Sequence, residues 1–197
     1  MPSSIEIGRL LRAGTTGFIA GCSVSQFETP AFGGLVRAPL GNGYQVYGLI
    51  YDIHIDDDGL VRQLVTSDNI SAEVMRDNRE RRIVPVEMSV LSVGFEQDGH
   101  IFHLLPPRPP LSLDVIYRCD NQEVARFTAA GHFGYFRHIL RVKDAPVGEL
   151  LAAHIRQAAV AHTPDWQEAA VQELITLLRD DYPTLMAVLG ALSDVAG

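Results

Sequence analysis

The sequence predicts a mainly β protein with added α-helix, in which residues 1–142 form a small closed β-barrel and residues 143–197 form a C-terminal helical segment. Two observations predict this fold class. Up to Lys143, short apolar runs alternate with turn residues, without long helices between them, which is typical of an antiparallel barrel or sandwich. After Lys143 the apolar residues recur at helical spacing. Hydrophobic residues make up 47% of the chain, which is enough to form a packed core.

The expected barrel strands are bounded by segments rich in Gly, Pro, Asn and Asp, which favour turns. The turn segments are AGTTG, TPAFGG, LGNG, DDDG and QDG. One short helix is expected among the strands, over residues 71–81, with Asn69 or Ser71 as its N-cap. The strands are expected over residues 4–11, 17–24, 35–39, 44–56, 60–66, 83–95, 100–105 and 113–118.

Three short amphipathic helices are expected in the C-terminal segment. The first follows Pro146, the second begins with Thr163 as N-cap and Pro164 at its first position, and the third follows Pro183. Three short helices have too little chain to bury all their apolar stripes among themselves, so at least one stripe should dock on another surface. That surface is either the barrel of the same chain or another protein. The side chains expected to bind such a partner are Leu174, Leu178, Leu185 and Leu189.

Composition and charge narrow the function classes. The net charge is −8, of which residues 144–197 carry −6, and neither part has the basic excess that a nucleic-acid surface needs. The RDNRERR segment is interpreted as a solvated helix face with internal ion pairs. No apolar run reaches the ~18 residues of a membrane helix, and we expect a soluble, cytoplasmic protein. Cys22 and Cys119 are far apart in the sequence, so they form no disulfide framework or zinc knuckle.

The segment YGLIYDIHIDDDG is the strongest candidate for chemistry. Alternate residues of a strand share a face, so the apolar set from Tyr47 to Ile55 should face the core and Asp52, His54 and Asp56 should face solvent. An imidazole and two carboxylates are ligands that a metal-dependent hydrolase would need. A polar strand face that ends in a hairpin turn at residues 57–59 explains the same residues without a metal. We favour the turn and assign no metal ligand.

Other catalytic templates do not match the chain. Lys143 is the only lysine and lacks the glycine-rich context of a Walker A motif, and no glycine segment has the spacing of a dinucleotide site. Ser23 and Ser25 have no base or orienting acid nearby in the sequence. The pairs His100 with His103 and His132 with His138 are interpreted as structural histidines. We therefore expect no enzyme, no catalytic residue and no cofactor.

The proline-rich segment LLPPRPPL places Arg108 between two expected strands. Four prolines favour a stiff polyproline II conformation, which is typical of a ligand for an aromatic groove or of a rigid spacer. A rigid crossover on the barrel is favoured because the segment directly joins two strands. Arg108 is retained as a candidate contact to a partner.

The segments IGRLLRAGTTGFIAGCSV, GNGYQVYGLIYDIHID and LLPPRPPLSLDVIYRC resemble the HAS barrel, the domain shared by HerA-type DNA-translocating ATPases and the N-terminal crown of ATP-synthase head subunits. The resemblance covers about residues 4–142. It implies a non-catalytic barrel that packs against neighbouring barrels in a ring and can receive a partner protein. This chain lacks the ATPase domain of HerA, so any motor role would be exercised through another chain.

These observations predict a non-catalytic binding or assembly module, an accessory or ring-forming partner of a HerA-like ATPase. Self-association or a protein partner is expected, and direct contact with nucleic acid is not. One alternative is a metal-dependent hydrolase that uses Asp52, His54 and Asp56. Another is a single-stranded nucleic-acid-binding barrel, against which the acidic charge argues.

Overall fold

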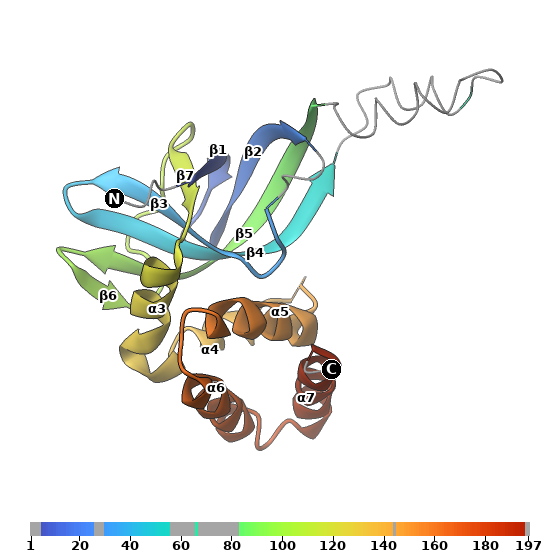
Figure 1. Cartoon of the computed structure of the whole chain (residues 1–197). Coiled ribbons are helices and arrows are strands. Elements are labelled where there is room, and N and C mark those ends of the chain that lie inside the picture. The colour runs from blue at the N-terminus through green and yellow to red at the C-terminus, as the bar shows by residue number, and fades with distance from the viewer. Residues whose placement is uncertain (1–4, 26–29, 56–65, 67–82, 144, 196–197) are drawn as a thin grey trace.

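The computed structural model describes residues 5–25, 30–55, 66, 83–143 and 145–195, and shows a closed antiparallel β-barrel with helices packed beneath it (Figure 1). The fold class predicted from the sequence is therefore confirmed. The strand expected over residues 60–66, all but Thr66, lies outside the described residues. The same is true of the helix expected over 71–81, the turn expected at 57–59 and the side chain of Asp56.

The barrel is closed by six of the described strands, in the order β2, β1, β7, β3, β4, β5 and back to β2. Every neighbouring pair is antiparallel, and the closing pair joins Gly17 of β2 to Leu91 of β5. The short strand β6 pairs only with β5 and extends the sheet beyond the closed ring. The strands are β1 (Ile5–Ala13), β2 (Gly17–Ser25), β3 (Leu35–Gly41), β4 (Tyr44–Ile55), β5 (Ile83–Gln97), β6 (His100–Phe102) and β7 (Val115–Arg118).

Two hairpins have the tight turns that their sequences predict. Asn42 and Gly43 join β3 to β4 with φ values of 51° and 69°. Asp98 and Gly99 join β5 to β6 with φ values of 51° and 83°. Positive φ at both central residues is the geometry of a type I′ turn, whose twist matches that of the paired strands. The LGNG and QDG segments are thus confirmed as hairpin turns.

The first part of strand β4, residues 44–50, is buried on both faces, which its sequence pattern did not predict. Val46 and Ile50 belong to a cluster built only from barrel strands, which fills the barrel interior. Tyr47 and Leu49 point to the opposite face and pack against the helices. A bulge between Ile50 and Asp52 then shifts the alternation, so that Ile53 packs against the interior cluster. The expectation that Tyr47, Leu49 and Ile53 share one core face was wrong for this reason.

The helical part begins at Asn121, well before the change of hydrophobic period at Lys143. Asp120 and Glu123 form a capping box, in which the Asp120 carboxylate accepts from the Glu123 N–H at 2.9 Å and the Glu123 carboxylate accepts from the Asp120 N–H at 3.0 Å. The helices are α3 (Asn121–Ala129), the 3₁₀ segment η2 (Ala130–Phe133), α4 (Phe136–Ile139), α5 (Val147–Ala159), α6 (Pro164–Leu177) and α7 (Tyr182–Val195).

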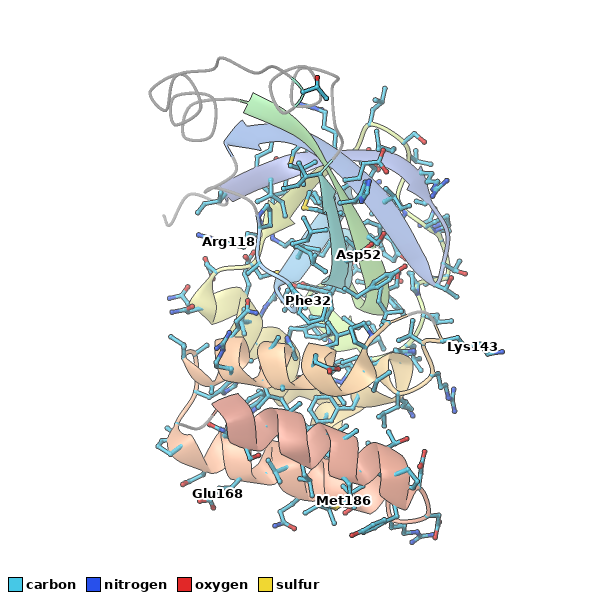
Figure 2. All side chains as sticks on the ribbon, turned by 90° about the vertical axis from the view of Figure 1, so that its right-hand side faces the viewer. Phe32, Asp52, Arg118, Lys143, Glu168 and Met186 are labelled. Atoms are coloured by element: carbon cyan, nitrogen blue, oxygen red, sulfur yellow. The ribbon has the colours of Figure 1, made fainter. Side chains whose placement is uncertain are left out.

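Helix α5 forms a middle layer between the barrel and the pair α6 and α7 (Figure 2). Its residues Leu150, Leu151 and Ile155 are fully buried in the cluster that joins the barrel's outer face to the helices. The loop before β3 approaches α5 closely, because a Cβ on Gly33 would lie 2.8 Å from the Ala153 Cβ. The outer face of the barrel and the helices therefore share one cluster, separate from the barrel interior, and the helices are not an independent appendage.

Candidate functional site

The polar face of β4, which carries the residues considered as alternative metal ligands, lies in solvent. Asp52 and His54 are both exposed, and the Asp52 carboxylate accepts from the Ile53 N–H at 3.0 Å. Their solvent-facing orientation is confirmed. Within the described part of the chain, no three His, Cys, Asp or Glu side chains come close enough together to hold a metal ion.

The leucines expected to bind a partner are largely used within the chain. Leu174 is fully buried and Leu178 is 5% exposed, and both belong to the cluster beneath the barrel. Leu185 packs against the same cluster, and Leu189 is half-buried. This packing corrects the prediction for Leu174 and Leu178, because α6 packs against α5 of the same chain and both side chains are buried in the shared cluster.

Arg108 lies on the outside of the barrel, in the proline-rich segment between β6 and β7. Its guanidinium carbon is 5.5 Å from the centre of the Tyr44 ring, and the Tyr44 hydroxyl donates to the Arg108 carbonyl at 3.1 Å. The segment is thus attached to the barrel at its middle, as a rigid crossover would be. Arg108 remains exposed.

Three leucines on neighbouring segments project from the barrel surface, and we call them the leucine rim: Leu11, Leu111 and Leu113. Their exposed fractions are 50%, 68% and 72%. The segment that carries Leu111 and Leu113 lies along β1, because the Leu113 N–H donates to the Leu10 carbonyl at 2.8 Å and Ser112 Oγ donates to the Leu11 carbonyl at 3.4 Å. Leu113 has a φ of 71°, in the left-handed region that a branched side chain avoids.

A polar cluster fastens α3 to the barrel. Arg126 donates from two nitrogens to the Glu96 carboxylate at 2.9 and 2.6 Å, and the Tyr47 hydroxyl donates to the same carboxylate at 2.8 Å. Burial alone would raise the pKa of Glu96, but the hydrogen bonds from Arg126, Gln45 and Tyr47 outweigh it and lower that pKa. Burial, reinforced by the Glu96 charge, raises the pKa of Tyr47. Every polar side chain of this cluster has a hydrogen-bond partner, so we interpret the cluster as a structural one that stabilises the packing of α3 on the barrel.

Three of the four histidines in the two sequence pairs contact backbone carbonyls, as structural histidines do. His100 is exposed, with its Nδ1 3.2 Å from the Asp98 carbonyl, whereas His103 is buried, with its Nε2 3.0 Å from the Phe127 carbonyl. His132 is exposed, and His138 instead reaches the His103 carbonyl through its Nε2 at 3.1 Å. The structure therefore joins one member of each expected pair through a backbone carbonyl.

A cleft of about 580 Å³ opens between the β1–β2 hairpin and the residues that follow α4, and we call it the basic cleft. Arg12, His138 and Arg141 provide its charged and titratable lining. Ser92 and mostly apolar residues complete the lining. The remaining lining residues are Ala13, Gly14, Thr16, Gly17, Phe18, Ile19, Tyr51, Val90, Leu91, Leu105 and Val142. The lining comes from β1, β2, β4, β5, the proline-rich segment and residues 138–142, so no local motif could have revealed it.

No protein-family model matches the chain, and no curated protein matches it either. Among the described helices, none combines the length and the apolar character that crossing a membrane requires.

Proposed function

We propose that the chain is a non-catalytic assembly module, an accessory or ring-forming partner of a HerA-like ATPase, and that the leucine rim is its contact with a neighbouring barrel. The exposure of Leu11, Leu111 and Leu113 at one place on the barrel carries this proposal. Contiguous exposed leucines on an otherwise well-packed protein are typical of a protein–protein contact.

The conformation of Leu113 adds to this argument. A left-handed backbone costs an L-residue roughly 1–2 kcal/mol, and Asn or Gly would relieve this cost. The turn is nevertheless held firmly, since the Asp114 carboxylate accepts from the Leu111 N–H at 2.8 Å and the Asp114 N–H donates to the Leu111 carbonyl at 3.1 Å. A strained position that presents an apolar side chain to solvent favours a contact in which that side chain is used.

The kind of partner follows from the resemblance of residues 4–142 to the HAS barrel. Barrels of that family pack side by side in a ring, and the rim lies on the outer surface of β1 and the segment before β7. A specific contact of this kind would bury at least ~1,000 Å² in total.

Light scattering on the full chain, alone and with a purified HerA-type ATPase of the same organism, tests the proposal. We expect association in at least one of the two samples, and we expect Leu111→Ser with Leu113→Asn to abolish it. Val160→Ser is the matched control, because Val160 is 74% exposed at the end of α5 and should not take part. A wild-type chain that stays monomeric in both samples, or association that survives the rim substitutions, would overturn the proposal.

A further inference from the structure

We propose that the basic cleft binds a small organic anion, with an oxyanion head held by Arg12 and Arg141 and an apolar body held against the barrel. This site is distinct from the proposed assembly contact, because no residue of the leucine rim lines it. A cleft of about 580 Å³ lies within the range of roughly 300–1,000 Å³ that small-molecule sites occupy.

The charge of the cleft is opposite to that of the protein. The chain has a net charge of −8, yet no acidic side chain is found among the described residues that line the cleft. Arg12 and Arg141 are exposed, and neither forms an ion pair with any residue in the described part of the chain. Two arginines that converge on one cleft without acidic neighbours are suited to a carboxylate or a phosphate, which accept paired hydrogen bonds from guanidinium groups.

Ser92 belongs to the inner wall of the cleft. It is fully buried on β5, and its hydroxyl has no hydrogen-bond partner within the described structure. The Ser92 N–H donates to the Thr16 carbonyl at 3.0 Å, which joins β5 to the turn between β1 and β2. Because the hydroxyl is fully buried, a ligand in the cleft does not reach it, and the oxyanion contacts are assigned to Arg12 and Arg141 alone.

The rest of the lining suits an apolar body. Leu105 is 42% exposed, and Ile19, Tyr51 and Val142 are partly exposed. A fully polar anion such as inorganic phosphate would leave these side chains in contact with water. A ligand with a short hydrocarbon chain or ring covers them, and this arrangement of many apolar groups with a few convergent polar ones is typical of small-molecule sites.

His138 reports on the charge inside the cleft. Its Nε2 must donate to the His103 carbonyl, because a carbonyl only accepts, so the neutral ring has an unprotonated Nδ1. Burial lowers the pKa of His138, and the positive charges of Arg137 and Arg141 lower it further against the opposing effect of the His103 carbonyl. Arg12 faces the same cleft, and the buried His103 lies behind the ring. A bound anion would favour the imidazolium, so the pKa of His138 should rise on binding, and an anion whose charge does not change in this range, such as a carboxylate, should bind more tightly at pH 6 than at pH 8.

The test is an NMR titration of the full chain with three probes that share a six-carbon body: hexanoate, hexyl phosphate and hexanol. We expect saturable binding of at least one anion, with shifts at residues that line the cleft and a raised pKa of His138, and no comparable binding of hexanol. The tighter of the two anions identifies the head group as carboxylate or phosphate.

Variants separate the proposal from nonspecific binding. Arg12→Ala and Arg141→Ala should each weaken the anion about tenfold, as expected for a charge-assisted hydrogen bond, whereas Arg156→Ala on α5 removes the same charge away from the cleft and should change nothing. Ser92→Ala removes a hydroxyl that a ligand does not reach, so it should leave the affinity unchanged while raising the thermal stability of the free protein. The proposal would be overturned if neither anion saturated binding up to about 10 mM. It would also be overturned if hexanol bound equally well, or if both arginine variants kept the wild-type affinity.

Discussion

Mild acid is expected to destabilise the protein through His154, a residue of α5 that is 1% exposed. Its Nδ1 is 3.2 Å from the Gly33 carbonyl, which only accepts, so Nδ1 is the donor. Its Nε2 therefore accepts from the Tyr135 hydroxyl at 3.1 Å. A second proton on the ring would place an unpaired charge between the barrel and α5. Burial, opposed in part by the bond to Gly33, lowers the pKa of His154 to about 4.

The size of the effect follows from that value. The ordinary pKa of 6.5 applies to the unfolded chain, so the unfolded state binds more protons than the folded state between pH 6.5 and 4. The contribution of His154 to the free energy of unfolding is complete above pH 6.5 and is lost as the pH falls toward 4. Between pH 7.5 and pH 5 the expected loss is about 2 kcal/mol, from the linkage of one proton.

Urea unfolding of wild type, His154→Gln and His100→Gln at both pH values measures this contribution. Each variant removes one histidine, but His100 is exposed on the β5–β6 hairpin. We expect His154→Gln to have a free energy of unfolding that falls about 2 kcal/mol less on acidification than that of wild type, and His100→Gln to follow wild type. Burial also lowers the pKa values of His103, His138 and His162, and their common contribution cancels in the comparison. Equal pH dependence of His154→Gln and wild type would refute the reasoning.

Four further substitutions test other parts of the structure by urea or thermal unfolding. Arg126→Ala should lower the free energy of unfolding by about 2 kcal/mol, which is below the range for buried ion pairs because the arginine side chain is half exposed. In a Glu96→Gln background the same substitution should cost less than half as much. Equal losses in both backgrounds would show that the two side chains are not coupled. His132→Gly should stabilise by up to about 1 kcal/mol, because the exposed His132 has a φ of 46°, and a lowered melting temperature would count against this strain. Leu174→Ala should cost about 3 kcal/mol, and a cost below about 1 kcal/mol would show that this side chain is not part of the core. His54→Ala should change stability by less than about 1 kcal/mol, and a larger loss in the presence of a chelator-sensitive metal would revive a metal site on β4.

The elements predicted correctly are those whose signal is local. An Asn-Gly or Asp-Gly pair is suited to positive φ whatever surrounds it, so the hairpins at Asn42 and Asp98 could be placed from a few residues. The same holds for α6, whose Pro164 occupies the first turn as expected. Local backbone preference and hydrophobic period are sufficient for such elements.

The errors arise where burial depends on distant segments. Tyr47 and Leu49 alternate with Val46 and Ile50, and all four are apolar, so the pattern of β4 does not say which pair faces the barrel interior and which faces a helix. Helix α3 is short and polar on its first turn, and its Asp120–Glu123 capping box was the available signal for its start. The box was overlooked because the change of period after Lys143 is stronger.

The candidate sites show the same limit. The sequence drew attention to Asp52 and His54 because acidic residues and a histidine are adjacent there, and the structure leaves them on the surface. Arg12, Ser92 and Arg141 come from three distant segments of the sequence. They line one cleft only because the barrel closes and the residues after α4 pack beside the β1–β2 hairpin. Which distant residues meet depends on the topology of the fold, and the residue types and their local sequence do not predict it.

Closure of the barrel also sets the order in which the chain can fold. Ile5 of β1 pairs with Arg118 of β7, and β2 pairs with β5, so the first hairpin obtains its remaining neighbours only from segments made much later. During synthesis the open edges of β1 and β2 are templates for pairing with other chains until those segments emerge. Distant pairing of this kind slows folding, because the entropy of closing long loops is lost before the contacts form. Slow maturation on the ribosome, and a need for protection of the nascent hairpin, are therefore consequences of the strand order itself.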